Sequence, residues 1–164
     1  MADESTTHTG GCLCGAVRFE GEELWGAAYC HCRMCQKWVG NAFVLCAQFA
    51  RKTFRITQGE PRWHRSSEIL ERGFCSDCGT PLLGRYLVPA FSDWLLVTLG
   101  SLDHPERTPP ERHFGIESQL PWLAIHDDLP REPYQEGFIE SQADEAESNP
   151  SGVPEGWRWG DGMS

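Results

Sequence analysis

Apolar and polar residues alternate along several short segments of the chain, which is the pattern of half-buried β-strands. Val17 and Phe19 are predicted to point inward between polar neighbours. Residues 42–49 form a continuous apolar segment that predicts a buried strand, and residues 94–99 place alternate leucine and valine side chains on one face. Turn residues separate these segments, so the pattern predicts a mainly β protein with little helix.

Shorter signals predict the remaining elements. Residues 33–38 predict one helical turn that ends near Gly40, and residues 62–66 and 69–74 predict a hairpin. Residues 122–125 predict a last short strand. Glycine and proline between these segments keep each element short.

The length of 164 residues and the hydrophobic fraction of 40% suit one core rather than two. Residues 10–134 are therefore predicted to form one domain. Residues 1–9 predict a disordered leader, and the acidic residues 135–164, rich in Gly, Pro and Ser, predict a disordered or loosely docked tail. No apolar run approaches the roughly 20 residues that span a bilayer, and the first residues lack the features of a signal peptide. We therefore expect a cytoplasmic protein with no membrane partner.

Eight cysteines in a reducing compartment are typical of metal ligands rather than of disulfides. Four of them form two close pairs, Cys12 with Cys14 and Cys75 with Cys78. Four thiolates complete the tetrahedral coordination of a structural zinc ion. Because the two pairs lie far apart in the sequence, a zinc ion shared between them would join the first strand to the central hairpin. We predict a structural zinc at these four residues.

A second group, Cys30, Cys32 and Cys35, offers only three thiolates and leaves one zinc position open, as in catalytic zinc sites. Three thiolates weaken the metal as an activator of water. They suit the binding of an incoming thiol as its reactive thiolate, because a coordinated thiol is deprotonated. The predicted chemistry is attack of a thiol on a small electrophile, or the reverse carbon–sulfur cleavage. The two groups together predict two zinc ions per chain.

Three other residues offer a fourth ligand that would make the second site inert. His31 lies between two of the cysteines and is expected to point away from them. Cys46 lies within a predicted strand, where a small buried core residue is expected. His64 is the third candidate. A redox dithiol is a further alternative, although the sequence lacks the βαβ pattern of thioredoxin-like proteins.

The net charge of −10 disfavours a nucleic-acid partner, which needs a basic surface. Positive charge gathers only between residues 30 and 90, where nine basic side chains accompany four acidic ones. Because this segment contains the three-cysteine group, it favours a small anionic ligand there. Alternatively, its basic residues lie on solvated strand faces, namely Arg51, Lys52, Arg55, Arg62 and Arg65.

The cysteine motifs carry a resemblance to a known family. The matching segments are residues 11–17 (GCLCGAV), 30–35 (CHCRMC), 74–81 (FCSDCGTP), 99–103 (LGSLD) and 121–122 (PW). With these motifs, roughly residues 10–134 resemble the glutathione-dependent formaldehyde-activating enzyme (GFA) family, which includes centromere protein V-like proteins.

This resemblance implies a β-tent fold of small antiparallel sheets stapled by zinc. It also implies that the four outer cysteines bind the structural zinc. Cys30, Cys32 and Cys35 would bind the catalytic zinc, with the sulfur of glutathione in the fourth position. The implied carbon–sulfur lyase joins glutathione and formaldehyde into S-hydroxymethylglutathione.

We therefore predict a zinc-dependent carbon–sulfur lyase-type enzyme. It would add glutathione, or another small anionic thiol, to formaldehyde or a related small electrophile. The alternative is a non-catalytic zinc-stapled binding module, in which both metals are structural and residues 30–90 bind a partner. A homodimer is compatible with either function.

Overall fold

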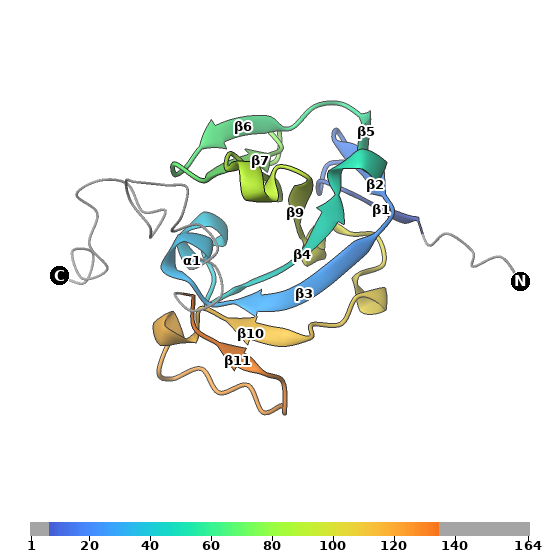
Figure 1. The fold of residues 1–164 in the computed structure, drawn as a ribbon. Helices are drawn as coiled ribbons and strands as arrows, with labels where there is room; N and C mark the ends of the chain where they lie inside the picture. The colour runs from blue at the N-terminus through green and yellow to red at the C-terminus, as the bar shows by residue number, and fades with distance from the viewer. Residues whose placement is uncertain (1–6, 135–164) are drawn as a thin grey trace, which may run out of the picture.

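The computed structural model describes residues 7–134, which form eleven short strands, one α-helix and five 3₁₀ turns (Figure 1). The strands are β1 (His8–Gly11), β2 (Arg18–Gly21), β3 (Leu24–Cys30), β4 (Val44–Ala50), β5 (Arg55–Gln58), β6 (Arg62–Arg65), β7 (Leu70–Phe74), β8 (Pro81–Tyr86), β9 (Trp94–Thr98), β10 (Arg112–Phe114) and β11 (Arg131–Glu132). Helix α1 is Arg33–Val39, and the 3₁₀ turns are Arg51–Thr53, Pro89–Phe91, Leu99–Ser101, Pro105–Arg107 and Ile116–Ser118. The prediction of a mainly β protein with little helix is confirmed.

The strands form two sheets. Strands β1, β2 and β5 make a three-stranded sheet, and the other eight follow the order β11-β10-β3-β4-β9-β8-β7-β6. Pairing is antiparallel, as expected, except that β10 runs parallel to both β3 and β11. The hairpin predicted around residue 67 is present as β6 and β7.

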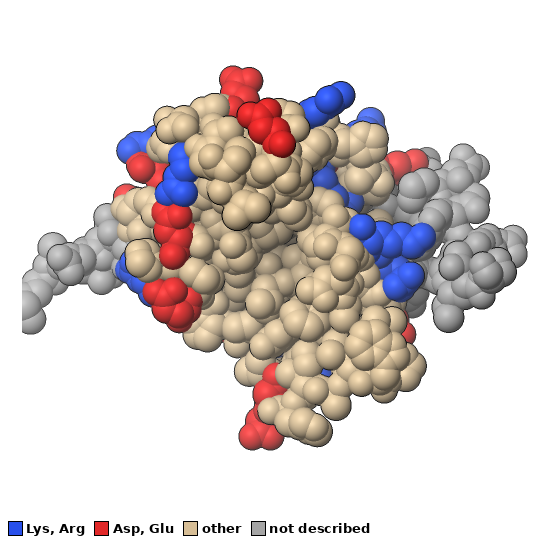
Figure 2. All heavy atoms as spheres, turned by 180° about the vertical axis from the view of Figure 1, so that it is seen from behind, with Lys and Arg blue, Asp and Glu red and all other residues tan. Residues whose placement is uncertain are grey.

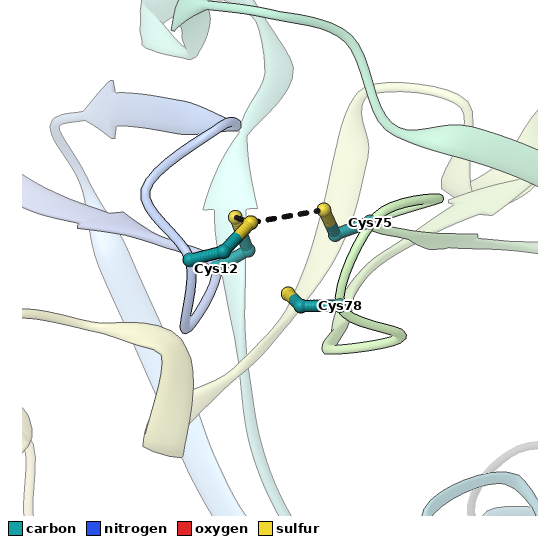
Figure 3. A group of neighbouring side chains, drawn as sticks. Cys12, Cys75 and Cys78 are labelled. Atoms are coloured by element: carbon teal, nitrogen blue, oxygen red, sulfur yellow. Dashed lines mark hydrogen bonds between the residues drawn. The ribbon is translucent and has the colours of Figure 1, made fainter.

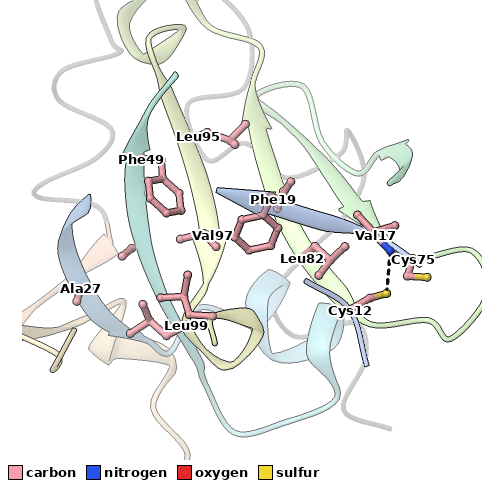
Figure 4. Close-up of a cluster of buried hydrophobic side chains, with 13 residues drawn as sticks. Cys12, Val17, Phe19, Ala27, Phe49, Cys75, Leu82, Leu95, Val97 and Leu99 are labelled. Carbon is pink, nitrogen blue, oxygen red and sulfur yellow. Dashed lines mark hydrogen bonds between the residues drawn. The ribbon is translucent and has the colours of Figure 1, made fainter. Parts of the chain in front are cut away.

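One face of the large sheet packs against the small sheet and forms the main hydrophobic core (Figure 4). Phe49 of β4 is fully buried there, and its ring contacts the rings of Phe19 and Phe54 at centroid distances of 6.4 and 5.4 Å. Val97 of β9 pairs with Ala47 and lies in the same cluster. The inward orientation predicted for Val17 and Phe19 is confirmed.

The opposite face of the same strands builds a second buried cluster. Val44 and Cys46 alternate with the core residues of β4, and Leu96 does the same on β9. Helix α1 lies close to this face, near the hairpin β6–β7 and above β3 and β10 in Figure 1. The central strands are therefore buried on both faces, and the second face carries the three-cysteine group.

The predicted strand at residues 122–125 is wrong. These residues follow a turn, and Trp122 is 74% exposed. The sheet edge is occupied instead by β10 and β11, which the sequence pattern missed because each has only two or three residues. The ordered chain also begins before residue 10, since Thr9 of β1 pairs with Glu20. The rest of the predicted leader and the predicted tail lie outside the described residues.

Within residues 7–134, no helix has the length and apolar character that crossing a membrane requires.

Replacing Phe49 by Ala should lower the free energy of unfolding by about 3–5 kcal/mol, because truncation of a buried ring leaves a cavity in the core. Urea denaturation followed by circular dichroism measures this change. Trp122→Ala is the control for loss of an exposed aromatic side chain, and it should change stability by about 0.5 kcal/mol or less. Equal losses in the two variants would contradict this assignment of the core.

Candidate metal centres and the adjoining cavity

The first metal-ligand group joins the two predicted cysteine pairs. One sulfur atom from each of Cys12, Cys14, Cys75 and Cys78 lies within 4.8 Å of all the others. The Sγ atoms of Cys12 and Cys14 are 3.5 Å apart, and those of Cys14 and Cys75 are 3.8 Å apart. Sulfurs bound at 2.3 Å to a tetrahedral zinc are about 3.8 Å apart, so this donor set fits a closed zinc site.

Two tight loops bring these sulfurs together, and Figure 3 shows the side chains of Cys12, Cys75 and Cys78 converging. Gly15 and Gly79, just after the two pairs, have φ angles of 79° and 76°. A residue with a side chain is strained in this left-handed conformation, whereas glycine adopts it readily. The loops connect β1 to β2 and β7 to β8, so the sulfurs link the two sheets.

Hydrogen bonds from neighbouring groups orient these sulfurs. The backbone N–H of Val17 donates to Cys12 Sγ at 3.2 Å, and Cys78 Sγ lies 3.1 Å from Thr80 Oγ1. Thr80 Oγ1 also accepts a hydrogen bond from the Leu13 N–H. The Thr80 hydroxyl is therefore free to donate to Cys78. This hydrogen bond is the largest of several, including those from the backbone N–H groups of Thr80 and Cys14, that lower the pKa of Cys78 to about 5. Sequence reasoning missed Thr80, although it lies two residues after a ligand.

The second group consists of Cys30, Cys32 and Cys35, all buried, with sulfurs within 4.8 Å of one another. Cys30 ends β3 and its Sγ lies 3.5 Å from Cys32 Sγ. Cys32 is the N-cap of α1, where its sulfur accepts a hydrogen bond from the Cys35 N–H at 3.4 Å. The Cys-x-x-Cys spacing therefore places the cap and the first helical turn around one centre.

Among the described residues, no other histidine, cysteine, aspartate or glutamate joins these three within the same distance. His31 points away, as predicted, and its Nε2 lies 2.9 Å from His113 Nδ1. Cys46 lies in the buried cluster on β4, and burial raises the pKa of its thiol. His64 lies on β6 and lines, with Trp63, a surface cleft that none of the three cysteines lines.

All eight cysteines are free thiols, and none of them forms a disulfide. This arrangement agrees with the choice of metal ligands over disulfides.

The three-cysteine group opens onto a cavity of about 460 Å³. Three neighbouring strands of the large sheet form the floor of the cavity. Arg112 of β10 pairs with Ala28 of β3, and Ala28 pairs with Cys46 of β4. The remaining walls are mostly apolar and aromatic: Trp25, Met34, Ile69, Leu70, Tyr86, Trp94, Leu96, Phe114 and Tyr134. A mostly apolar cavity with a few polar groups is typical of a small-molecule site.

Arg72 is the buried cation nearest to the sulfurs. Its guanidinium lies 5.3 Å from the centre of the Trp38 ring and donates from Nη1 to Ser66 Oγ. The pKa of Cys35 is lowered well below that of an ordinary thiol. Hydrogen bonds with Cys30 and Cys32 are the largest causes, and the positive charge of Arg72 adds to them. Hydrogen bonding to the neighbouring cysteines and burial raise the pKa of Cys30 and Cys32, so the first negative charge of the group falls on Cys35.

Three polar atoms around the cavity are buried without a hydrogen-bond partner: Arg72 Nε, Arg112 Nε and Gln48 Oε1. The Arg112 guanidinium lies over Gly26, since a Cβ atom on that glycine would be 3.8 Å from Arg112 Nη2. Its Nη1 lies 3.6 Å from Glu132 Oε2. Unpaired buried donors and acceptors are costly in a folded protein, so these atoms mark places where a ligand is expected.

Of the basic residues assigned to solvated strand faces, Lys52 and Arg55 form surface ion pairs with Glu23 and Glu20. On the face shown in Figure 2, charged side chains lie around the margin and the centre is largely uncharged. In the cavity beside the three-cysteine group, the positive charges are those of Arg72 and Arg112, of which only Arg72 lies within residues 30–90.

These features define a mainly β protein with two thiolate groups that could each hold a metal ion, one of them beside a cavity. The family model described as glutathione-dependent formaldehyde-activating enzyme matches residues 7–118. The chain belongs to this family.

Two individual proteins are similar to the chain. A Schizosaccharomyces pombe protein named an uncharacterized lyase is 32% identical over 82 residues, which cover 48% of this chain and 58% of that protein. This chain thus spans less than two thirds of that relative. A Rhodobacter sphaeroides protein of known crystal structure is 22% identical, with a TM-score of 0.49 over 58% of this chain and 87% of that one.

The two thiolate groups should respond differently to loss of one ligand. Cys75→Ser should remove one metal ion and abolish cooperative thermal unfolding, because the first group links the two sheets. Cys32→Ser should remove one metal ion and keep the transition. Elemental analysis and differential scanning calorimetry measure both effects. If Cys32→Ser unfolds the protein as Cys75→Ser does, the two groups do not divide structural and functional roles.

Proposed function

We propose that this protein is a zinc-dependent carbon–sulfur lyase-type enzyme. It adds glutathione, or a related small anionic thiol, to formaldehyde or a similar small electrophile, and it catalyses the reverse cleavage. Family membership supports this reaction. The name of the S. pombe relative supports the lyase class.

One observation carries the proposal: three buried cysteine sulfurs, with no fourth protein ligand among the described residues, line a cavity large enough for a small organic molecule. A purely structural metal site would be closed by a fourth side chain. The cavity also argues against the binding-module alternative, in which both metals would be enclosed by protein.

Zinc is the metal that best fits the donor sets. Groups of three and four thiolates are typical zinc ligands, and the sulfur separations match tetrahedral geometry. When bound at the three-cysteine group, zinc would supply the positive charge that keeps a substrate sulfur in its thiolate form.

The remaining chemistry requires no oxidant or reductant. A bond forms between the thiol sulfur and the carbonyl carbon, while the carbonyl π-bond breaks and its oxygen takes up the proton that the thiol has lost. The chain holds the sulfur, keeps water away with the apolar walls of the cavity, and compensates the charge. Arg72 suits the last role, since its guanidinium lies beside Cys35 and lowers the pKa of that thiol together with Cys30 and Cys32.

Glutathione has two carboxylates and one ammonium group that need partners. The guanidinium of Arg112 lies over Gly26, which belongs to β3, the strand that ends at Cys30. The Nε atom of Arg112 is buried and has no hydrogen-bond partner. It can therefore receive a carboxylate while the sulfur lies at the cysteines. Glu111 lines the same cavity and offers an acceptor to the ammonium group. The charges of the cavity thus complement those of glutathione.

Titration calorimetry of zinc-loaded protein with glutathione tests the proposed function. We expect saturable binding by the wild type and by Cys46→Ser, and loss of binding in Cys32→Ser. S-methylglutathione keeps the charges of glutathione but has no free thiol, so it should bind at least about tenfold more weakly, since the metal–thiolate interaction is lost. Unchanged glutathione binding by Cys32→Ser would refute the proposed site.

Arg112→Met should raise the dissociation constant of glutathione by about 10–100-fold, because a hydrogen bond to a charged group contributes about 1.5–3 kcal/mol. Binding of 2-mercaptoethanol, which has no carboxylate, should stay unchanged. Arg107→Met removes an exposed arginine that does not line the cavity and serves as the matched control. Equal weakening of both thiols by Arg112→Met would contradict the role of Arg112 as a carboxylate anchor.

A further inference from the structure

A buried chain of hydrogen bonds leads from the protein surface to the loop of the three cysteines. The Asp127 carboxylate oxygens lie 3.0 and 3.2 Å from His113 Nε2. His113 Nδ1 lies 2.9 Å from His31 Nε2, and both imidazoles are 0% exposed. At the outer end, Arg131 Nη2 donates to Asp127 Oδ1 at 3.3 Å.

The carboxylate selects one arrangement of hydrogen atoms along this chain. An ionised Asp127 can only accept, and hydrogen bonding from His113 lowers its pKa. A neutral His113 therefore carries its proton on Nε2 and accepts through Nδ1, which makes His31 Nε2 a donor. Each ring is thus held in a single orientation. Stacking of His113 on Tyr29, at a centroid distance of 4.7 Å, adds to this constraint.

His31, the residue between two metal ligands, is fixed at three points. Its backbone N–H donates to Phe114 O at 2.8 Å, and its carbonyl accepts from Gln36 Nε2 at 2.6 Å. The third point is the imidazole, which His113 holds. The backbone of Cys30 and Cys32 cannot turn independently of a neighbour held in this way.

The remaining nitrogen of His31 has no partner. Its Nδ1 is buried and makes no hydrogen bond. Leaving such an atom unpaired costs about 1–3 kcal/mol, and an apolar residue of similar size would avoid this cost. Stability alone therefore does not account for a histidine at position 31. The hydrogen bond from its imidazole to His113 is the interaction that requires an explanation.

We propose that Asp127 and His113 are positioning residues, which hold His31 and thereby set the arrangement of the Cys30 and Cys32 sulfurs for metal binding. This inference rests on the proposed function only in requiring that the three-cysteine group binds a metal. Asp127 lies beyond residues 7–118, which the family model matches, so it extends the site into the C-terminal part of the described chain. In other metal sites, loss of such an outer hydrogen bond typically weakens metal affinity by about 10–100-fold.

The test measures the affinity of each site for Co²⁺, whose thiolate complexes absorb light, by competition with a chelator. The absorption that is lost in Cys32→Ser identifies the three-cysteine site. Asp127→Ala should lower the Co²⁺ affinity of this site by about 10–100-fold and should leave the affinity of the four-cysteine site unchanged. Asp127→Asn should lose less, because its amide oxygen still accepts from His113 Nε2. Glu106→Ala is the matched control, since Glu106 also bonds a histidine, His104, at 3.1 Å.

Each outcome decides the inference. Unchanged affinity of both sites in Asp127→Ala, with two sites in the wild type, would overturn the positioning role and leave the proposed function intact. Equal weakening of both sites in Asp127→Ala would indicate a general structural role and would also overturn it. A wild type with only the four-cysteine site would overturn both proposals.

Discussion

The twofold alternation of side chains along strand β4 is the constraint on which the two halves of this protein depend. Ala47 and Phe49 face the core between the sheets, whereas Val44 and Cys46 face the second buried cluster, which contains the three-cysteine group, and Cys46 also lines the cavity. A shift of one residue in the register would place the core side chains in the cavity and the cavity side chains in the core. The same strand therefore carries the core and the floor of the candidate site.

The two thiolate groups use the same ligand in different structural settings. Cys12 and Cys75 lie on loops that bring the two sheets together, so a metal bound there would contribute to folding. Cys32 and Cys35 lie at the start of a helix beside the cavity, where Cys30, Cys32 and Cys35 would be the three protein ligands of a metal. The structural and reactive roles proposed for the two groups thus correspond to a difference in the number of cysteines and in access, rather than in ligand chemistry.

Much of this organisation could be predicted from the sequence, because short spacings determine geometry directly. The Cys-x-Cys and Cys-x-x-Cys pairs place their sulfurs within reach of one metal without help from the rest of the fold. The contributions of Arg112, His113 and Asp127 could not be predicted in this way. They reach the site through the pairing of β10 with β3 and through a loop with no regular pattern, and strands of two or three residues leave no periodic signal. The error at residues 122–125 is the converse one, because apolar residues there predict a strand although Trp122 is exposed and the chain is irregular.

The most direct test of the central claim is the number of zinc ions per chain in protein purified without chelator. The four-cysteine group and the three-cysteine group beside the open cavity are each expected to bind one metal ion. The expected ratio is therefore two zinc ions per chain. Elemental analysis combined with an accurate protein concentration gives this ratio. A ratio of one that added zinc does not raise would contradict the account, because the three-cysteine group would then hold no zinc for a substrate thiol to reach.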